Sequence, residues 1–188
     1  MIVTFDAPAR SGNHFSVAVL SNYFPDIKLF WGYEQPHNPK SFTLSKEKTE
    51  HILTVLRNPV DSIVSSFILF KTPLDKSALD NIIDNKEMLQ SMLDNVDNIH
   101  ISSFEDLTKN TPKYISDISK ILDIKPVHAD IDNIKNKLKT YNRENFYVIP
   151  VDNQIKKDTF KGLILNNYKN EIEECLDLYQ SLQQYVIL

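Results

Sequence analysis

The sequence has 188 residues, of which 41% are hydrophobic and 24% are charged, and its net charge is −4. These values are typical of a globular protein with one domain, spanning residues 1–188. They exclude the overall basic surface of a nucleic-acid-binding protein, and no apolar run reaches the roughly 18 residues of a membrane-spanning helix. The chain enters its first apolar run without the features of a signal peptide. We therefore expect a cytoplasmic protein with neither a nucleic-acid nor a membrane partner.

The first predicted elements are a strand and a helix joined by a short turn. Ile2–Phe5 is apolar and rich in β-branched side chains, which favours a buried strand. The turn carries Pro8 and Gly12, and the apolar periodicity that follows predicts a helix over residues 11–23. A strand that leads through small residues into a helix directs backbone N–H groups and the positive end of the helix dipole at one point. Such a point is a typical phosphate site.

Arg10 would add a permanent positive charge and a planar set of donors to this turn. The same residues also fit an ordinary strand-to-helix turn with a surface arginine, because short motifs occur by chance. Two common phosphate loops are excluded, since the chain contains neither Gly-x-x-x-x-Gly-Lys-Ser/Thr nor three suitably spaced glycines.

A second strand is predicted over residues 27–33, followed by a loop that contains Glu34 and His37. In a parallel sheet this loop lies at the carboxyl edge of the strands, beside Arg10, where open α/β sheets bind ligands. Glu34 and His37 are therefore candidate general bases. Each also has a simpler interpretation, Glu34 as a solvated loop acid and His37 as a turn residue without a role in proton transfer.

The third predicted strand, His51–Leu56, runs into a segment that begins a helix well. Asn58 suits the N-cap position, Pro59 the first helical position and Asp61 the first turn. The segment therefore fits a simple helix start. It also places Arg57 eight residues before Ser65, and an arginine side chain can pair with phosphate oxygens through two N–H groups at once.

The rest of the chain alternates less regularly. A short strand over residues 99–102 precedes Phe104, and an aromatic residue after a strand usually belongs to the core. We assign Glu105 and Asp106 to a solvated helix start. Further helices are predicted over residues 79–93 with a polar interruption at 84–86, from residue 111 to about 125, over 131–138 and over 159–185. The single cysteine and the absence of clustered ligands give no sign of a metal site.

Three short segments of the chain resemble the sulfotransferase superfamily. The resemblance implies a three-layer α/β/α fold with a mostly parallel central sheet, related to the P-loop NTPases. The three segments are Ala9-Arg10-Ser11-Gly12-Asn13-His14, where the family typically has Pro-Lys/Arg-Ser-Gly-Thr-Thr, then Arg57 to Ser65, and Phe104-Glu105-Asp106-Leu107. In that family the first segment binds the 5′-phosphosulfate of the donor and the second binds its 3′-phosphate. The aromatic residue of the third segment lies against adenine.

The resemblance also implies the reaction and its participants. The donor would be 3′-phosphoadenylyl sulfate (PAPS), the product 3′-phosphoadenosine 5′-phosphate (PAP), and no metal would be required. The acceptor would be a hydroxyl or amine of a small molecule or glycan. Glu34 matches the base of the tyrosylprotein and heparan branches, and His37 approximates that of the cytosolic branch. The implied donor-binding residues are Arg10, Ser11, Gly12, Asn13, His14, Arg57, Ser65 and Phe104, with Lys156 and Lys157 in place of a family Arg-Lys-Gly loop.

Two alternatives from other classes remain open. A nucleotide-dependent kinase of small molecules would need a lysine for the γ-phosphate and a Ser/Thr–Asp pair for Mg²⁺, and the chain has no Gly-Lys-Ser/Thr. A non-catalytic nucleotide-binding module of the same fold would keep the donor site without transferring a group.

Overall fold

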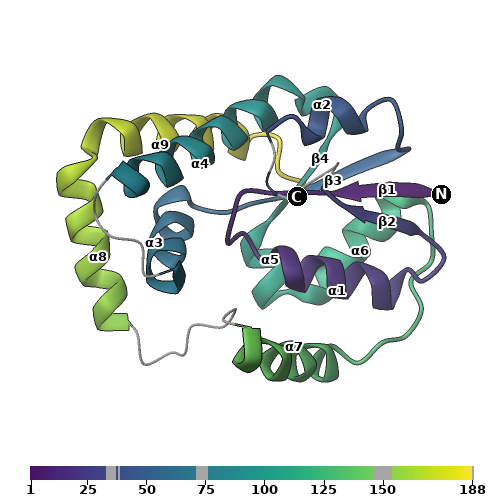
Figure 1. The fold of residues 1–188 in the computed structure, drawn as a ribbon. Coiled ribbons are helices and arrows are strands. Elements are labelled where there is room, and N and C mark those ends of the chain that lie inside the picture. The colour runs from purple at the N-terminus through teal and green to yellow at the C-terminus, as the bar shows by residue number, and fades with distance from the viewer. Residues whose placement is uncertain (33–36, 38, 71–75, 146–153, 188) are drawn as a thin grey trace.

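Within the part of the chain that the structure describes, a parallel sheet of four strands forms the centre. The computed structural model describes residues 1–32, 37, 39–70, 76–145 and 154–187. The strand order is β2-β1-β3-β4, and every neighbouring pair is parallel (Figure 1). The carboxyl ends of these strands therefore lie along one edge. The strands are β1 (Ile2–Phe5), β2 (Lys28–Trp31), β3 (His51–Leu56) and β4 (His100–Ser103).

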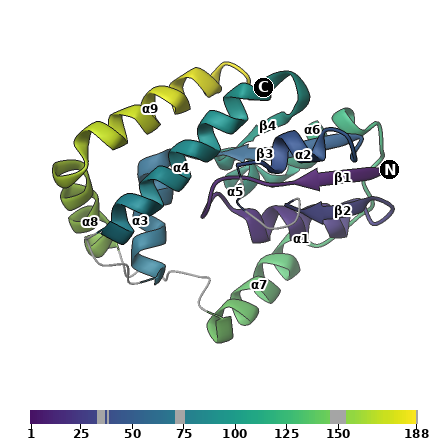
Figure 2. The same ribbon diagram turned by 45° about the horizontal axis from the view of Figure 1, so that its top comes forward.

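Helices cover both faces of the sheet and give three layers. Helices α1, α5, α6 and α7 pack on one face, and α2, α3, α4, α8 and α9 pack on the other (Figures 1 and 2). None of the described helices is both long and apolar enough to cross a membrane. The bounds are α1 (Asn13–Tyr23), α2 (Ser41–Ser45), α3 (Pro59–Phe70), α4 (Lys76–Asp94), α5 (Phe104–Lys109), α6 (Thr111–Leu122), α7 (Ile131–Asn145), α8 (Gln154–Asn167) and α9 (Lys169–Gln183), with a 3₁₀ turn at Val96–Asn98.

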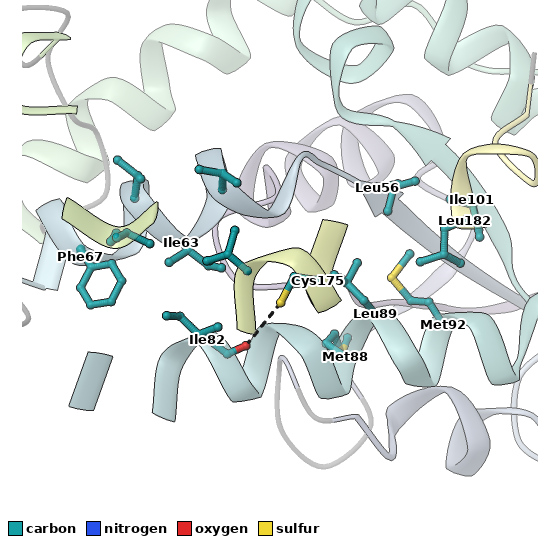
Figure 3. Close-up of a cluster of buried hydrophobic side chains, with 14 of the residues drawn as sticks. Leu56, Ile63, Phe67, Ile82, Met88, Leu89, Met92, Ile101, Cys175 and Leu182 are labelled. Carbon is teal, nitrogen blue, oxygen red and sulfur yellow. Dashed lines mark hydrogen bonds between the residues drawn. The ribbon is translucent and has the colours of Figure 1, made fainter. Parts of the chain in front are cut away.

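Side chains alternate along β3 and belong to two separate hydrophobic clusters. Ile52 and Leu56 belong to the cluster beneath α3, α4 and α9, whereas Leu53 and Val55 belong to the cluster beneath α1 and α6. Successive strand residues point to opposite faces, so a sheet covered on both sides favours a nearly continuous apolar strand, which β3 is apart from His51 and Thr54. Figure 3 shows the first cluster, in which side chains from α3, α4 and α9 interleave over the sheet.

Cys175 lies at the centre of this first cluster. Its side chain is fully buried, and its sulfur lies 3.9 Å from the carbonyl oxygen of Ile82 on α4 (Figure 3). Burial raises the pKa of the Cys175 thiol to about 11, because the charged thiolate is disfavoured away from water. The thiol is therefore a packing group that links α9 to α4.

Three predicted helices differ from the structure, and the helix predicted over residues 131–138 differs only in length, since α7 continues to Asn145. The predicted helix over residues 159–185 is wrong, because it is divided at Tyr168, whose φ of −132° lies outside the helical range. The division lets α8 pack against α3 while α9 packs against α4. The predicted interruption at residues 84–86 is also wrong, since α4 is continuous there. Asn85 is buried in α4, and its side-chain amide donates to the carbonyl oxygen of Asn81 at 3.2 Å.

A pair of histidines lies at the amino edge of the sheet, opposite the carboxyl ends of the strands. His51 and His100 begin β3 and β4, and their Nδ1 and Nε2 atoms lie 3.4 Å apart beside a pocket of about 310 Å³. Burial lowers the pKa of His100 below its usual 6.5, and the neighbouring His51 acts in the same direction. Ligands of open α/β sheets bind at the carboxyl edge, whereas this pocket lies at the amino edge. We therefore do not assign it as the ligand site.

Neighbouring isoleucines of α4 provide a test of the first core. Ile82 is fully buried and Ile83 is 39% exposed. We expect Ile82→Ala to lower the free energy of unfolding by about 2–5 kcal/mol, because it leaves a cavity beneath α3 and α9. The same change at Ile83 should cost about 0.5 kcal/mol or less. Urea unfolding of both variants measures the difference, and equal losses would contradict the described packing of α4.

The lowered pKa of His100 predicts a loss of stability in acid. As the pH falls below 6.5, the unfolded chain takes up a proton at this position before the folded chain does. The free energy of unfolding should therefore decrease over that range, and His100→Gln should make the decrease shallower. His14, whose pKa burial also lowers, would retain part of the dependence. Urea unfolding at several pH values tests this, and an unchanged slope in His100→Gln would contradict the described burial of His100.

Candidate functional site

The loop between β1 and α1 has a backbone that only particular residues tolerate. Gly12 has φ of 80° and Arg10 has φ of 63°, both in the left-handed region. A Cβ atom on Gly12 would lie 2.9 Å from Cδ2 of Leu107 and 3.2 Å from Cε2 of Phe104. Helix α5 therefore packs directly on the loop, and the position requires glycine for both conformation and space.

The N-terminus of α1 has the features of an anion site. Its N-cap residue, Gly12, has no side chain that could cap the helix, and its first turn contains no acidic residue. The first N–H groups of a helix have no partner within the helix, and the helix dipole favours negative charge beside them. The loop itself is held in shape, since the Ser11 N–H and the Asn13 side-chain amide both donate to the Pro8 carbonyl at 3.2 Å.

The segment that begins with Arg57 fastens this loop from the neighbouring strand. The Arg57 guanidinium donates to the carbonyl oxygen of Arg10, and the Ser62 hydroxyl donates to that of Ala9. In the other direction, Nε of Arg10 donates to Oγ of Ser65 at 3.3 Å. The two segments that the sequence analysis selected for phosphate binding therefore lie against each other.

Arg57 is held by a backbone carbonyl and an aromatic ring. Its guanidinium carbon lies 4.4 Å from the ring centroid of Phe104, a cation–π contact. Burial lowers the pKa of Arg57, Asp61 opposes that effect, and the charge of Arg10 adds to it. Two guanidinium groups in one partly buried region repel each other, so a bound anion would stabilise the arrangement.

A pocket of about 250 Å³ opens beside Arg57, between α3 and α8. Lys157 and Lys161 line it from α8, and Nζ of Lys161 lies 3.8 Å from Oδ1 of Asp61. Lys157 thus lies near Arg57, where the resemblance would place a cation, whereas the side chain of Lys156 lies outside the described residues. Within the described part of the chain, no group of three or more His, Cys, Asp or Glu side chains could hold a metal ion.

His37 lies against the start of the same loop. Its Nδ1 is 2.9 Å from the Ala7 carbonyl oxygen, and its backbone N–H donates to Oδ1 of Asp6 at 3.0 Å. The Asn13 side-chain amide also lies 3.2 Å from Nδ1. An amide N–H group donates and a carbonyl oxygen accepts, so these two neighbours of Nδ1 favour opposite tautomers of the ring. The other candidate base, Glu34, lies outside the described residues.

An aromatic cluster borders the loop on the side of β2. The ring of Trp31, the last residue of β2, lies 4.6 Å from that of His14 and 6.3 Å from that of His37, both edge-on. Burial lowers the pKa of His14, and the charges of Arg10 and His37 add to the effect. His14 is therefore favoured in its neutral form, which leaves Arg10 as the permanent cation of the loop.

Sequence reasoning missed three residues of this site. Asp6 carried a detectable signal, because a charged residue directly after a parallel strand lies at the carboxyl edge, where open α/β sheets bind ligands. Ser62 and Trp31 carried none, since a serine in a helix and an aromatic at a strand end are ordinary. Phe104, predicted to face a base or the core, packs against Gly12 and Arg57.

Comparison with known proteins supports the fold. No model of a known protein family matches the chain, and no curated protein sequence does. The structure is similar to the crystal structure of mouse sulfotransferase SULT7A1 complexed with PAP, with a TM-score of 0.56 and 15% sequence identity. The match covers 98% of this chain and 89% of that one. The predicted α/β fold class is confirmed, and the fold is sulfotransferase-like.

Two glycines allow a matched test of the loop. Gly12→Ala should lower the free energy of unfolding by about 1–3 kcal/mol, because the left-handed backbone and the contact with Leu107 both oppose a Cβ atom. At Gly162, within α8, a Cβ would meet nothing within 4 Å, so Gly162→Ala should stabilise by about 0.5–1 kcal/mol. Urea unfolding gives both values, and a tolerated alanine at position 12 would show that the loop conformation is described wrongly.

Proposed function

We propose that the protein is a sulfotransferase that moves a sulfuryl group from PAPS to a hydroxyl or amine of a small-molecule or glycan acceptor. The observation that supports this most is the set of hydrogen bonds joining the loop at Ala9 and Arg10 to Arg57, Ser62 and Ser65. PAPS carries phosphate at both ends of its nucleoside. An enzyme for it needs two phosphate sites at a fixed separation, and these bonds fix two such segments together.

The described residues fit this donor. Arg10 and the backbone N–H groups of residues 11–14 would hold the 5′-phosphosulfate at the uncapped start of α1. Arg57 and Ser65 would hold the 3′-phosphate, with Lys157 at the adjoining pocket. Phe104, whose ring contacts the Arg57 guanidinium, would face the adenine. When bound, PAPS supplies the sulfuryl group and leaves as PAP.

The chain's own contribution is position and charge. Group transfers of this kind need little covalent help, so a fixed arrangement of cations and N–H groups provides most of the catalysis. Arg10 would stabilise the negative charge that develops on the leaving phosphate. His37 would take the acceptor proton at Nε2 in the tautomer whose Nδ1–H donates to the Ala7 carbonyl, with Glu34 as the second candidate base.

The proposal predicts selective stabilisation by PAP. A ligand at 100 times its Kd raises the free energy of unfolding by about 2.7 kcal/mol. We expect this effect with PAP and a much smaller one with AMP, which lacks the 3′-phosphate. Arg57→Ala should abolish the PAP effect, whereas Lys169→Ala, which removes an exposed cation on α9, should preserve it. Thermal or urea unfolding with each ligand measures these changes.

The other results of this titration favour the rival functions. Stabilisation by ATP only in the presence of Mg²⁺ would indicate a kinase. Binding of PAP without transfer from PAPS to any acceptor in a screen of phenols, alcohols, amines and sugars would indicate a non-catalytic module. No stabilisation at millimolar PAP would contradict every role for a 3′-phosphorylated nucleotide.

A further inference from the structure

The first residue after β1 is a fully buried acid. Asp6 has no exposed surface, and its Oδ1 accepts the backbone N–H groups of Ala7 at 2.9 Å and His37 at 3.0 Å. Burial raises the pKa of the Asp6 carboxyl, and the hydrogen bond from His37 is the strongest of the effects that oppose it. A carboxyl group in such a place is costly, and a neutral side chain could close the turn at lower cost.

The hydrogen bond from His37 spans 31 positions and connects two loops. Through it, Asp6 joins the end of β1 to the segment that follows β2. The His37 ring is then fastened a second time, by the Ala7 carbonyl at Nδ1. The Asn13 side-chain amide also lies 3.2 Å from Nδ1, so these contacts hold the ring through Nδ1 and leave Nε2 as the nitrogen away from the Ala7 carbonyl.

The backbone of His37 supports the same conclusion. Its φ of 60° lies in the left-handed region, as does that of Arg10, and such conformations persist only where surrounding contacts enforce them. The third described non-glycine residue of this kind, Asp123, ends α6, where a left-handed residue is ordinary. Both of these unusual backbone conformations thus lie in the candidate site. The hydrogen bond to Asp6 is the contact that holds the backbone of His37 in its conformation.

We propose that Asp6 is a positioning residue, which holds His37 ready to take the acceptor proton and stabilises the imidazolium that results. Oδ1 of Asp6 lies 3.8 Å from Nδ1 of His37, within reach of an ionic interaction once the ring is charged. The acceptor O–H or N–H bond breaks, its proton moves to Nε2, and the positive charge of the ring then lies beside the buried carboxylate. The inference rests on the proposed sulfotransferase function.

Two substitutions at Asp6 separate its contributions. Asp6→Asn keeps an oxygen that accepts both N–H groups but removes the charge, whereas Asp6→Ala removes both. We expect Asp6→Ala to lower kcat by on the order of 10²-fold, as a misplaced catalytic group does, with unchanged stabilisation by PAP. Asp6→Asn should recover part of that loss. Asp117→Ala, which removes a buried acid of α6, is the control expected to lower stability and leave kcat unchanged.

A double-substitution cycle shows whether Asp6 acts through His37. In a His37→Gln protein, Asp6→Ala should lower kcat no further, because the group that it positions is gone. An equal fold loss in both backgrounds would overturn the inference, and so would a parallel loss of PAP stabilisation. Should Asp6→Ala fail to fold, Asp6→Asn carries the same cycle.

A spectroscopic measurement tests the positioning without turnover. Nitrogen NMR of the imidazole at alkaline pH should show His37 as the Nδ1–H tautomer in the wild-type protein and as a mixture in Asp6→Ala. An unchanged tautomer in the variant would overturn the role of Asp6 while leaving the sulfotransferase proposal intact. A wild-type protein that neither binds PAP nor transfers sulfate would instead overturn the proposed function, and this inference with it.

Discussion

The hydrogen bond from the Arg57 guanidinium to the Arg10 carbonyl is the interaction on which the candidate site depends. The partners of this partly buried cation are a backbone carbonyl and the face of Phe104, and neither carries a formal charge. A carboxylate in their place would have held the side chain as firmly but cancelled its field. Arg57 is thus fixed while its positive charge remains available, and the carbonyl that it binds belongs to the other arginine of the site.

Parallel pairing makes this contact possible. Neighbouring strands β1 and β3 run in the same direction, so Arg57 emerges beside the loop that follows β1. The sequence was sufficient to predict this much, because it depends on local signals. Each of these signals predicts a conformation from neighbouring residues alone: the apolar strand at Ile2–Phe5, the glycine at position 12, and Asn58 before a proline. Asn58 indeed caps its helix, since its side chain accepts the N–H of Val60 at 3.0 Å.

The features that could not be predicted arise from contacts distant in sequence. Asp6 meets His37 only because two loops converge at the sheet edge, and nothing near either residue indicates the other. The helix break at Tyr168 has the same origin, since α8 and α9 bury their apolar faces against different partners. A continuous apolar period in the sequence predicts that one face of a helix is buried, but it does not indicate which element covers that face.

The burial of Cys175 makes the protein's single thiol an internal reporter. Thiolates react with alkylating and disulfide reagents, and a buried thiol that hardly ionises near neutral pH reacts only when the surrounding structure opens. Its sulfur contacts α4 from α9, so the rate of labelling measures how often these two helices separate. Exchange between closed and open forms could thus be followed in the unaltered chain, without an introduced probe.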